Sequence, residues 1–159
     1  MAVLKITLPE LFIVLLPESL IMVFGVYILS KEPFNYKKIV IASLLTGVST
    51  YIIRMLPIYP GVNMLFAAII CTCIFAWYNK LNIMKAVPAL LVLLAVRLVT
   101  ELLNVILITE ILHLDLEELA SNTAKKTLAL FPSLILYFLL VLALYFLVYK
   151  KNKQKTEKN

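Results

Sequence analysis

The stretch AVPALLVLLAVRLVTELLNVILITEI, residues 86–111, decides the fold, because it is long and apolar enough to cross a lipid bilayer. A crossing helix needs about 20 mostly apolar residues. Further apolar runs occupy residues 8–29, 39–56, 62–78 and 128–149. Each run is continuously apolar rather than alternating, which argues against a membrane barrel. Lipid offers no hydrogen bonds to backbone N–H and C=O groups, so each crossing segment has to be a helix. The sequence therefore predicts an all-α bundle of about five transmembrane helices.

The composition of the whole chain supports this class. Of its 159 residues, 63% are apolar and 15% are charged, and the mean hydropathy is +1.00. Soluble domains average about 45–50% apolar and about 25% charged residues. A soluble domain of this length could not bury so many apolar side chains. We therefore expect the lipid bilayer to surround the helices.

Lysines are unevenly distributed between the apolar runs, and this predicts an orientation. The connections after the first and third runs and the C-terminal tail are basic; their lysines are Lys31, Lys37, Lys38, Lys80, Lys85, Lys150, Lys151, Lys153, Lys155 and Lys158. The connection after the second run is uncharged, and the one after the fourth is mixed. Basic connections stay inside. We expect a plasma-membrane protein with its N-terminus outside and its C-terminus in the cytoplasm, and no nucleic-acid partner despite the net charge of +6.

The third run is the shortest and begins beside Pro60 and Gly61. A re-entrant third run would leave four crossings. It would also place the basic segment 79–85 and the basic tail on opposite sides, against the charge rule. We therefore favour five crossings, followed by a cytoplasmic tail, residues 150–159, which is too polar and short to fold alone and is expected to be disordered.

Charged residues within the apolar runs are the candidates for function. Glu18, Arg54, Arg97 and Glu101 lie inside such runs. A charge at the bilayer centre costs about 2.5–3.5 kcal/mol on insertion scales, so it usually has a partner or a function. We expect Glu18 to pair with Arg97 and Glu101 with Arg54, where the first, second and fourth runs meet.

The fourth run carries a polar stripe. Arg97 and Glu101 are four residues apart and share a helix face, which Thr100 and Asn104 extend. The cluster can be interpreted as structural, with neutralised charges holding helices together. It can also be a ligand pocket or a switch, formed by Glu18, Arg54, Arg97, Glu101 and Asn104. Pro17 precedes Glu18, and its kink could serve motion and cation binding, or only packing.

Catalysis and metal binding find little support in the sequence. Cys71 and Cys73 are two residues apart, so on a helix they point in opposite directions. His113 has Glu110 and Glu117 at helical spacing, but this pattern is more typical of a solvated loop face than of a zinc site. Nucleophile-elbow and phosphate-loop motifs are not found. We expect a protein that is not an enzyme and needs no cofactor or metal.

Residues 54–62, RMLPIYPGV, resemble a stretch in the membrane module of some Gram-positive sensor histidine kinases. These kinases carry a GHKL-type ATPase domain, and some read peptide signals. The resemblance extends over about residues 5–112, and residues 54–62 are its specific part. It implies a multi-helix sensory module whose motion reaches the cytoplasm through the last helix. This sequence has no dimerising histidine helix or ATP-binding domain, so the resemblance implies an accessory or stand-alone module rather than a kinase.

These patterns lead to one main functional hypothesis and two alternatives. We expect a non-enzymatic membrane module for sensing or regulation, acting with a partner membrane protein such as a histidine kinase, or as a homo-oligomer. The first alternative is a small permease or transporter subunit that binds its solute at the midplane. The second is a structural subunit of a membrane complex.

Overall fold

A computed structural model describes residues 11–56, 60–111 and 123–156 of the chain, and it confirms the predicted all-α fold. These residues form helices and their connections, with no strand among them. The elements are η1 (Leu11–Leu15), α2 (Leu16–Ser30), α3 (Tyr36–Met55), α4 (Pro60–Trp77), α5 (Ile83–Ile106), η2 (Leu107–Ile111) and α7 (Thr123–Thr156). The η elements are π-helical turns.

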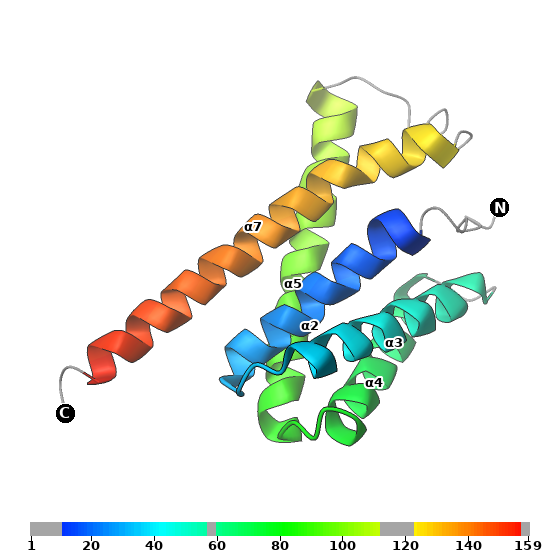
Figure 1. Ribbon diagram of the computed structural model, residues 1–159. Coiled ribbons are helices and arrows are strands. Elements are labelled where there is room, and N and C mark those ends of the chain that lie inside the picture. The colour runs from blue at the N-terminus through cyan, green and yellow to red at the C-terminus, as the bar shows by residue number, and fades with distance from the viewer. Residues whose placement is uncertain (1–10, 57–59, 112–122, 157–159) are drawn as a thin grey trace.

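Helix α2 occupies the centre of the bundle. It packs against α3, α5 and α7, whereas α4 packs on α3 and α5 (Figure 1). Half of the span Phe12–Ser30 is buried, compared with 11% of the span Leu128–Val148 in α7. The chain runs alternately up and down, so the two short connections α2–α3 and α4–α5 lie at the same end (Figure 1).

Four helices of the described residues are long and apolar enough to cross a membrane. Their spans are Phe12–Ser30, Tyr36–Met55, Ile83–Glu110 and Leu128–Val148. The apolar part of α4, Val62–Trp77, is shorter than these spans. It corresponds to the third predicted run, so the fifth crossing stays a prediction.

Close packing of α2 on α5 depends on a glycine. A Cβ atom added to Gly25 would lie 2.8 Å from the Cδ2 atom of Leu93, which is fully buried. Small residues allow helix backbones to approach in this way. Val23 and Val26 of α2 and Phe75 of α4 are buried in the same core. Side chains of α2, α3, α4, α5 and α7 form the core, and large apolar side chains are left exposed on the outer faces.

The structure differs from the prediction at the C-terminus. Helix α7 continues to Thr156, whereas the sequence predicts a disordered tail from residue 150. The helix extends because residues 150–156, KKNKQKT, contain no proline or glycine, and lysine and glutamine are good helix formers. The other helix boundaries differ from the predicted runs by a few residues, as expected from fraying ends.

Candidate functional site

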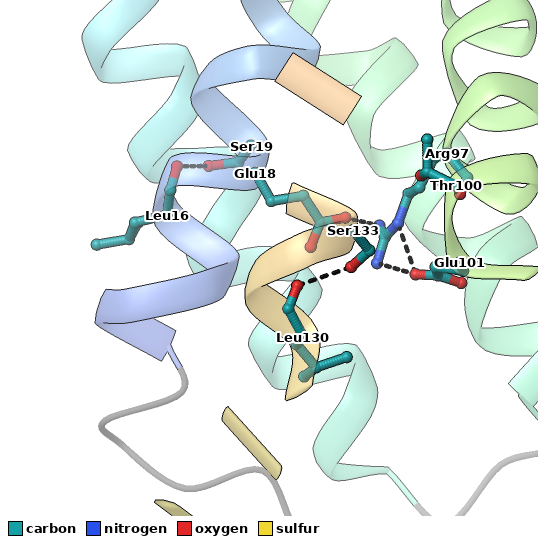
Figure 2. A network of polar contacts seen from close by, with 8 residues as sticks. All are labelled: Leu16, Glu18, Ser19, Arg97, Thr100, Glu101, Leu130 and Ser133. Carbon is teal, nitrogen blue, oxygen red and sulfur yellow. Dashed lines mark hydrogen bonds and ion pairs between the residues drawn. The ribbon is translucent and has the colours of Figure 1, made fainter. Parts of the chain in front are cut away.

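Arg97 on α5 is held between two carboxylates. Its Nη1 atom forms an ion pair with Oε1 of Glu18 on α2. Its Nη2 and Nε atoms lie 3.0 Å and 3.1 Å from Oε1 of Glu101, one turn further along α5 (Figure 2). One guanidinium therefore makes a contact between helices and a contact within its own helix.

The two carboxylates of this cluster differ in burial. The side chain of Glu18 is 11% exposed and that of Arg97 is 18% exposed, whereas that of Glu101 is 47% exposed. An ion pair is stronger and more sensitive to loss of a partner when water is excluded from it. The Glu18–Arg97 pair is thus the inner contact, and Glu101 is the outer partner that the surroundings can reach.

The start of α2 explains how Glu18 reaches this position. The π-helical turn η1 ends at Leu15, and Pro17 is the second residue of α2. Proline has no N–H and its ring crowds the preceding turn, and a π-helical turn is one way for a helix to absorb this. Where the sequence predicts a kink at Pro17, the structure has a change of helix type, and Glu18 lies in the first turn of α2.

A cavity of about 50 Å³ lies beside the Arg97 guanidinium. Its lining residues are Val14, Glu18, Arg54, Arg97, Thr100, Glu101, Leu130, Ser133, Leu134 and Tyr137. One water needs about 10–15 Å³ measured in this way, so the cavity has room for a few waters. The hydroxyl of Tyr137 is buried and makes no hydrogen bond to any described residue, so it can bind such a water.

Two of the contacts that the sequence suggests are present in the structure. The predicted contact of Glu18 with Arg97 is present, and Glu101 contacts Arg97 within α5, as their spacing suggests. The i,i+4 spacing explains this, because it places Glu101 beside Arg97 before any other helix packs. Arg54, the predicted partner of Glu101, reaches the same cavity from α3.

Sequence reasoning missed the contribution of α7. Ser133 and Tyr137 line the cavity from this helix, so the fifth run joins the site along with the three predicted runs. The two residues are four apart, on one helix face, in a run that is otherwise almost wholly apolar. That polar pair is the signal by which the sequence could have identified the contribution. The Ser133 hydroxyl donates to the Leu130 carbonyl at 2.7 Å (Figure 2).

Asn104 does not line the cavity. Its Nδ2 atom donates to the carbonyl of Ala129 on α7 at 2.8 Å, and its side chain is buried. Ala129 lies three residues before Pro132, inside α7. Polar side chains of neighbouring helices commonly satisfy backbone carbonyls near a proline in a membrane helix. Asn104, a predicted site residue, thus joins α5 to α7 instead of contacting the charges.

Ser19 makes a third polar contact between helices, which the sequence did not indicate. Its hydroxyl lies 2.8 Å from the carbonyl of Leu16 (Figure 2). It also lies 2.9 Å from the carbonyl of Ser43 on α3. It can donate to either carbonyl. Gly47 provides the space, since an added Cβ atom would lie 3.1 Å from the Ser19 hydroxyl. Ser19 therefore joins α2 to α3 next to the charged cluster.

The described residues contain no group of three or more His, Cys, Asp or Glu side chains placed to hold a metal ion. Cys71 is buried and Cys73 is exposed, in agreement with their predicted opposite directions on the helix. His113 and Glu117 lie outside the described residues, as do residues 57–59 of the kinase-like stretch.

Comparisons of the chain with protein-family models, with curated proteins and with solved structures found no match. The resemblance of residues 54–62 to sensor kinases therefore stays a prediction.

Proposed function

We propose that this chain is a multi-pass protein of the plasma membrane, with its N-terminus outside and its C-terminus in the cytoplasm. The arrangement of the helices supports this orientation. The α2–α3 and α4–α5 connections and the C-terminal end of α7 lie toward one end of the bundle (Figure 1). These are the three basic segments of the sequence, and basic segments remain on the cytoplasmic side.

Within the membrane, the protein acts as a non-enzymatic module for sensing or regulation, together with a partner protein. The observation that carries this proposal is the sharing of Arg97 between Glu18 and Glu101. The two carboxylates bind different nitrogen atoms of one guanidinium, so a change of charge at Glu101 alters the strength of the inner contact. The inner contact joins α2 to α5, and its loss frees these helices to move relative to each other.

A signal can enter this cluster at its exposed side and leave through the helices. Glu101 is half exposed, so a cation, a ligand or a partner side chain can reach it. Because α7 packs on both α5 and α2, a shift of these two helices is transmitted to α7. The C-terminal end of α7 is the part that a cytoplasmic partner would read.

The size of the cavity beside Arg97 favours regulation over transport at this site. Sites for small molecules usually measure about 300–1,000 Å³. The cavity beside Arg97 measures about 50 Å³, which suits waters or a single ion rather than an organic solute. A structural subunit remains the competing class, and it differs in one respect: its charges would matter only for folding.

A complementation experiment distinguishes these classes. The gene is deleted from its host, and the transcripts that change define the output. The strain is then complemented with wild type or with the double variant Glu18→Leu, Arg97→Leu, which removes both charges of the inner pair. Ser19→Ala is the matched control, because it breaks a contact between helices one residue away without altering charge.

We expect the double variant to accumulate in the membrane and to melt near wild type, yet to leave the output unrestored. The Ser19→Ala variant should restore it. Full restoration by a folded double variant would show that the charges are structural, and the proposal would be wrong. Absence of any transcript change on deletion would equally count against a regulatory role.

A further inference from the structure

A second, larger pocket lies at the end of the bundle where the α2–α3 and α4–α5 connections meet. Its volume is about 340 Å³, at the lower end of the range for small-molecule sites. Residues 32–35 and 79–81 of the two connections surround it, together with Tyr27 of α2 and Lys38 of α3. This pocket shares no residue with the Arg97 cluster, so it requires an explanation of its own.

The backbone of both connections turns at a left-handed lysine. Lys31 has a φ of 55° and Lys80 a φ of 54°, a conformation that few residues other than glycine adopt. After Lys31, the Glu32 N–H donates to the Tyr27 carbonyl, and after Lys80, the Leu81 N–H donates to the Phe75 carbonyl. Both connections therefore fold back over the ends of their helices and bring residues 32–35 and 79–81 around one space.

Two buried polar side chains in this space lack hydrogen bonds. Asn79 is 4% exposed, and neither its Nδ2 nor its Oδ1 atom has a partner within the described residues. Tyr27 is 2% exposed, and its hydroxyl likewise has none there. A buried polar group without a partner costs about 1–3 kcal/mol, so such groups usually serve a ligand or water. Both side chains can donate hydrogen bonds into the pocket.

The charge of the lining favours an anion. Lys38 and Lys80 contribute two ammonium groups, and neither forms an ion pair with another described residue. The single lining carboxylate, Glu32, is partly offset by Lys85, whose Nζ lies 3.4 Å from its Oε1 atom, so the lysines outweigh it. The pocket also adjoins the start of α3, where Asn35 caps the helix and the helix dipole is positive.

We propose that this pocket binds the phosphate group of an anionic phosphoester. Lys38 and Lys80 supply the charge, and the Asn79 amide and the Tyr27 hydroxyl supply neutral donors. The phosphate can belong to a lipid headgroup or to a soluble phosphoester. Phe34 forms one wall. Its ring centroid lies 6.3 Å from that of Tyr27, on which it stacks, and 5.4 Å from that of Phe24.

The test uses the full-length protein in a neutral detergent and its own fluorophore. Trp77 is the only tryptophan of the chain, and it lies two residues before Asn79. Its emission is followed during titration with short-chain phosphatidylglycerol, with phosphatidylcholine, and with glycerol 3-phosphate. The variants are Lys38→Gln, Lys80→Gln and Asn79→Leu. The matched control is Lys37→Gln, which removes the same charge from an exposed neighbour outside the lining.

We expect phosphatidylglycerol to bind more tightly than phosphatidylcholine. Lys38→Gln and Lys80→Gln should each weaken binding about tenfold, as loss of a charge-assisted hydrogen bond does. Lys37→Gln should change it by less than about twofold, because solvent screens an exposed charge. If Asn79→Leu does not fold, the two lysine variants decide the outcome.

Saturable binding of glycerol 3-phosphate with the same pattern of variants would identify a soluble phosphoester as the source. Binding of phosphatidylglycerol alone would identify a lipid headgroup. Equal binding of the two lipids, equal effects of Lys37→Gln and Lys38→Gln, or no response to any of the three compounds would overturn the proposal.

Discussion

Replacing Arg97 by leucine should destabilise the protein far more than replacing Arg97 together with Glu18. The single change leaves the Glu18 carboxylate, whose side chain is 11% exposed, without its cation. Breaking a buried ion pair by removing one partner costs about 3–5 kcal/mol. Removing both partners leaves apolar surface, which neighbouring helices and lipid tolerate, and this is often close to neutral. The coupling between Arg97 and Glu18 should therefore be about 3 kcal/mol.

The same calculation for Glu101 gives a much smaller value. Its side chain is 47% exposed, and it pairs with Arg97 within one helix at i,i+4 spacing. Such pairs contribute about 0.3–0.5 kcal/mol. The inner coupling should thus exceed the outer one several-fold, although one guanidinium makes both contacts.

The assay is a pair of double-mutant cycles on the purified protein in mixed micelles. Unfolding by a denaturing detergent is followed by circular dichroism for wild type, the single leucine variants of Glu18, Arg97 and Glu101, and the two double variants. Ser19→Ala combined with Arg97→Leu is the control and should be additive, since Ser19 shares no partner with Arg97. Additive losses for Glu18 and Arg97, or equal couplings for the two acids, would refute the proposed ranking of the contacts.

Two further predictions concern topology and packing. Reporter fusions after Lys80 and Lys158 should behave as cytoplasmic and a fusion after Glu117 as external; an active external-type phosphatase at Lys158 would contradict five crossings. Gly25→Ala should destabilise the bundle by about 1–3 kcal/mol, because the added Cβ atom lies 2.8 Å from buried Leu93, and melting that matches wild type would show that Leu93 can move aside.

The helices could be predicted from the sequence because lipid imposes a simple rule. Runs of about 20 apolar residues have to be helical, so the five predicted runs all correspond to helices. The exception is the tail, where residues 150–156 extend α7 as a helix. Hydropathy predicts which residues are apolar enough to cross a membrane. It does not predict how far a helix continues beyond its apolar part.

The charges of the candidate site and two of their contacts were predictable from the sequence. Glu18, Arg97 and Glu101 stand out because ionisable residues are rare in apolar runs. Which carboxylate meets which guanidinium depends on helix rotation and crossing angle, which the apolar pattern does not specify. The contribution of Tyr137 and the separate role of Asn104 depend on the packing of α7. The polar pair Ser133 and Tyr137 marks one face of that helix, but the sequence does not say which helices this face meets.

The contact between Glu18 and Arg97 has a consequence for the order in which the protein is made. Arg97 is synthesised 79 residues after Glu18 (97 − 18). At about 5–20 residues per second, some ~4–16 s pass before the acid can meet its cation. In the proposed topology, the first crossing helix thus enters the membrane before the helix that carries Arg97 has been made, and Glu18 has no cation during that time. Biogenesis of this protein would then depend on a site that shelters a half-formed contact, so an insertion machinery that releases helices singly should handle it poorly.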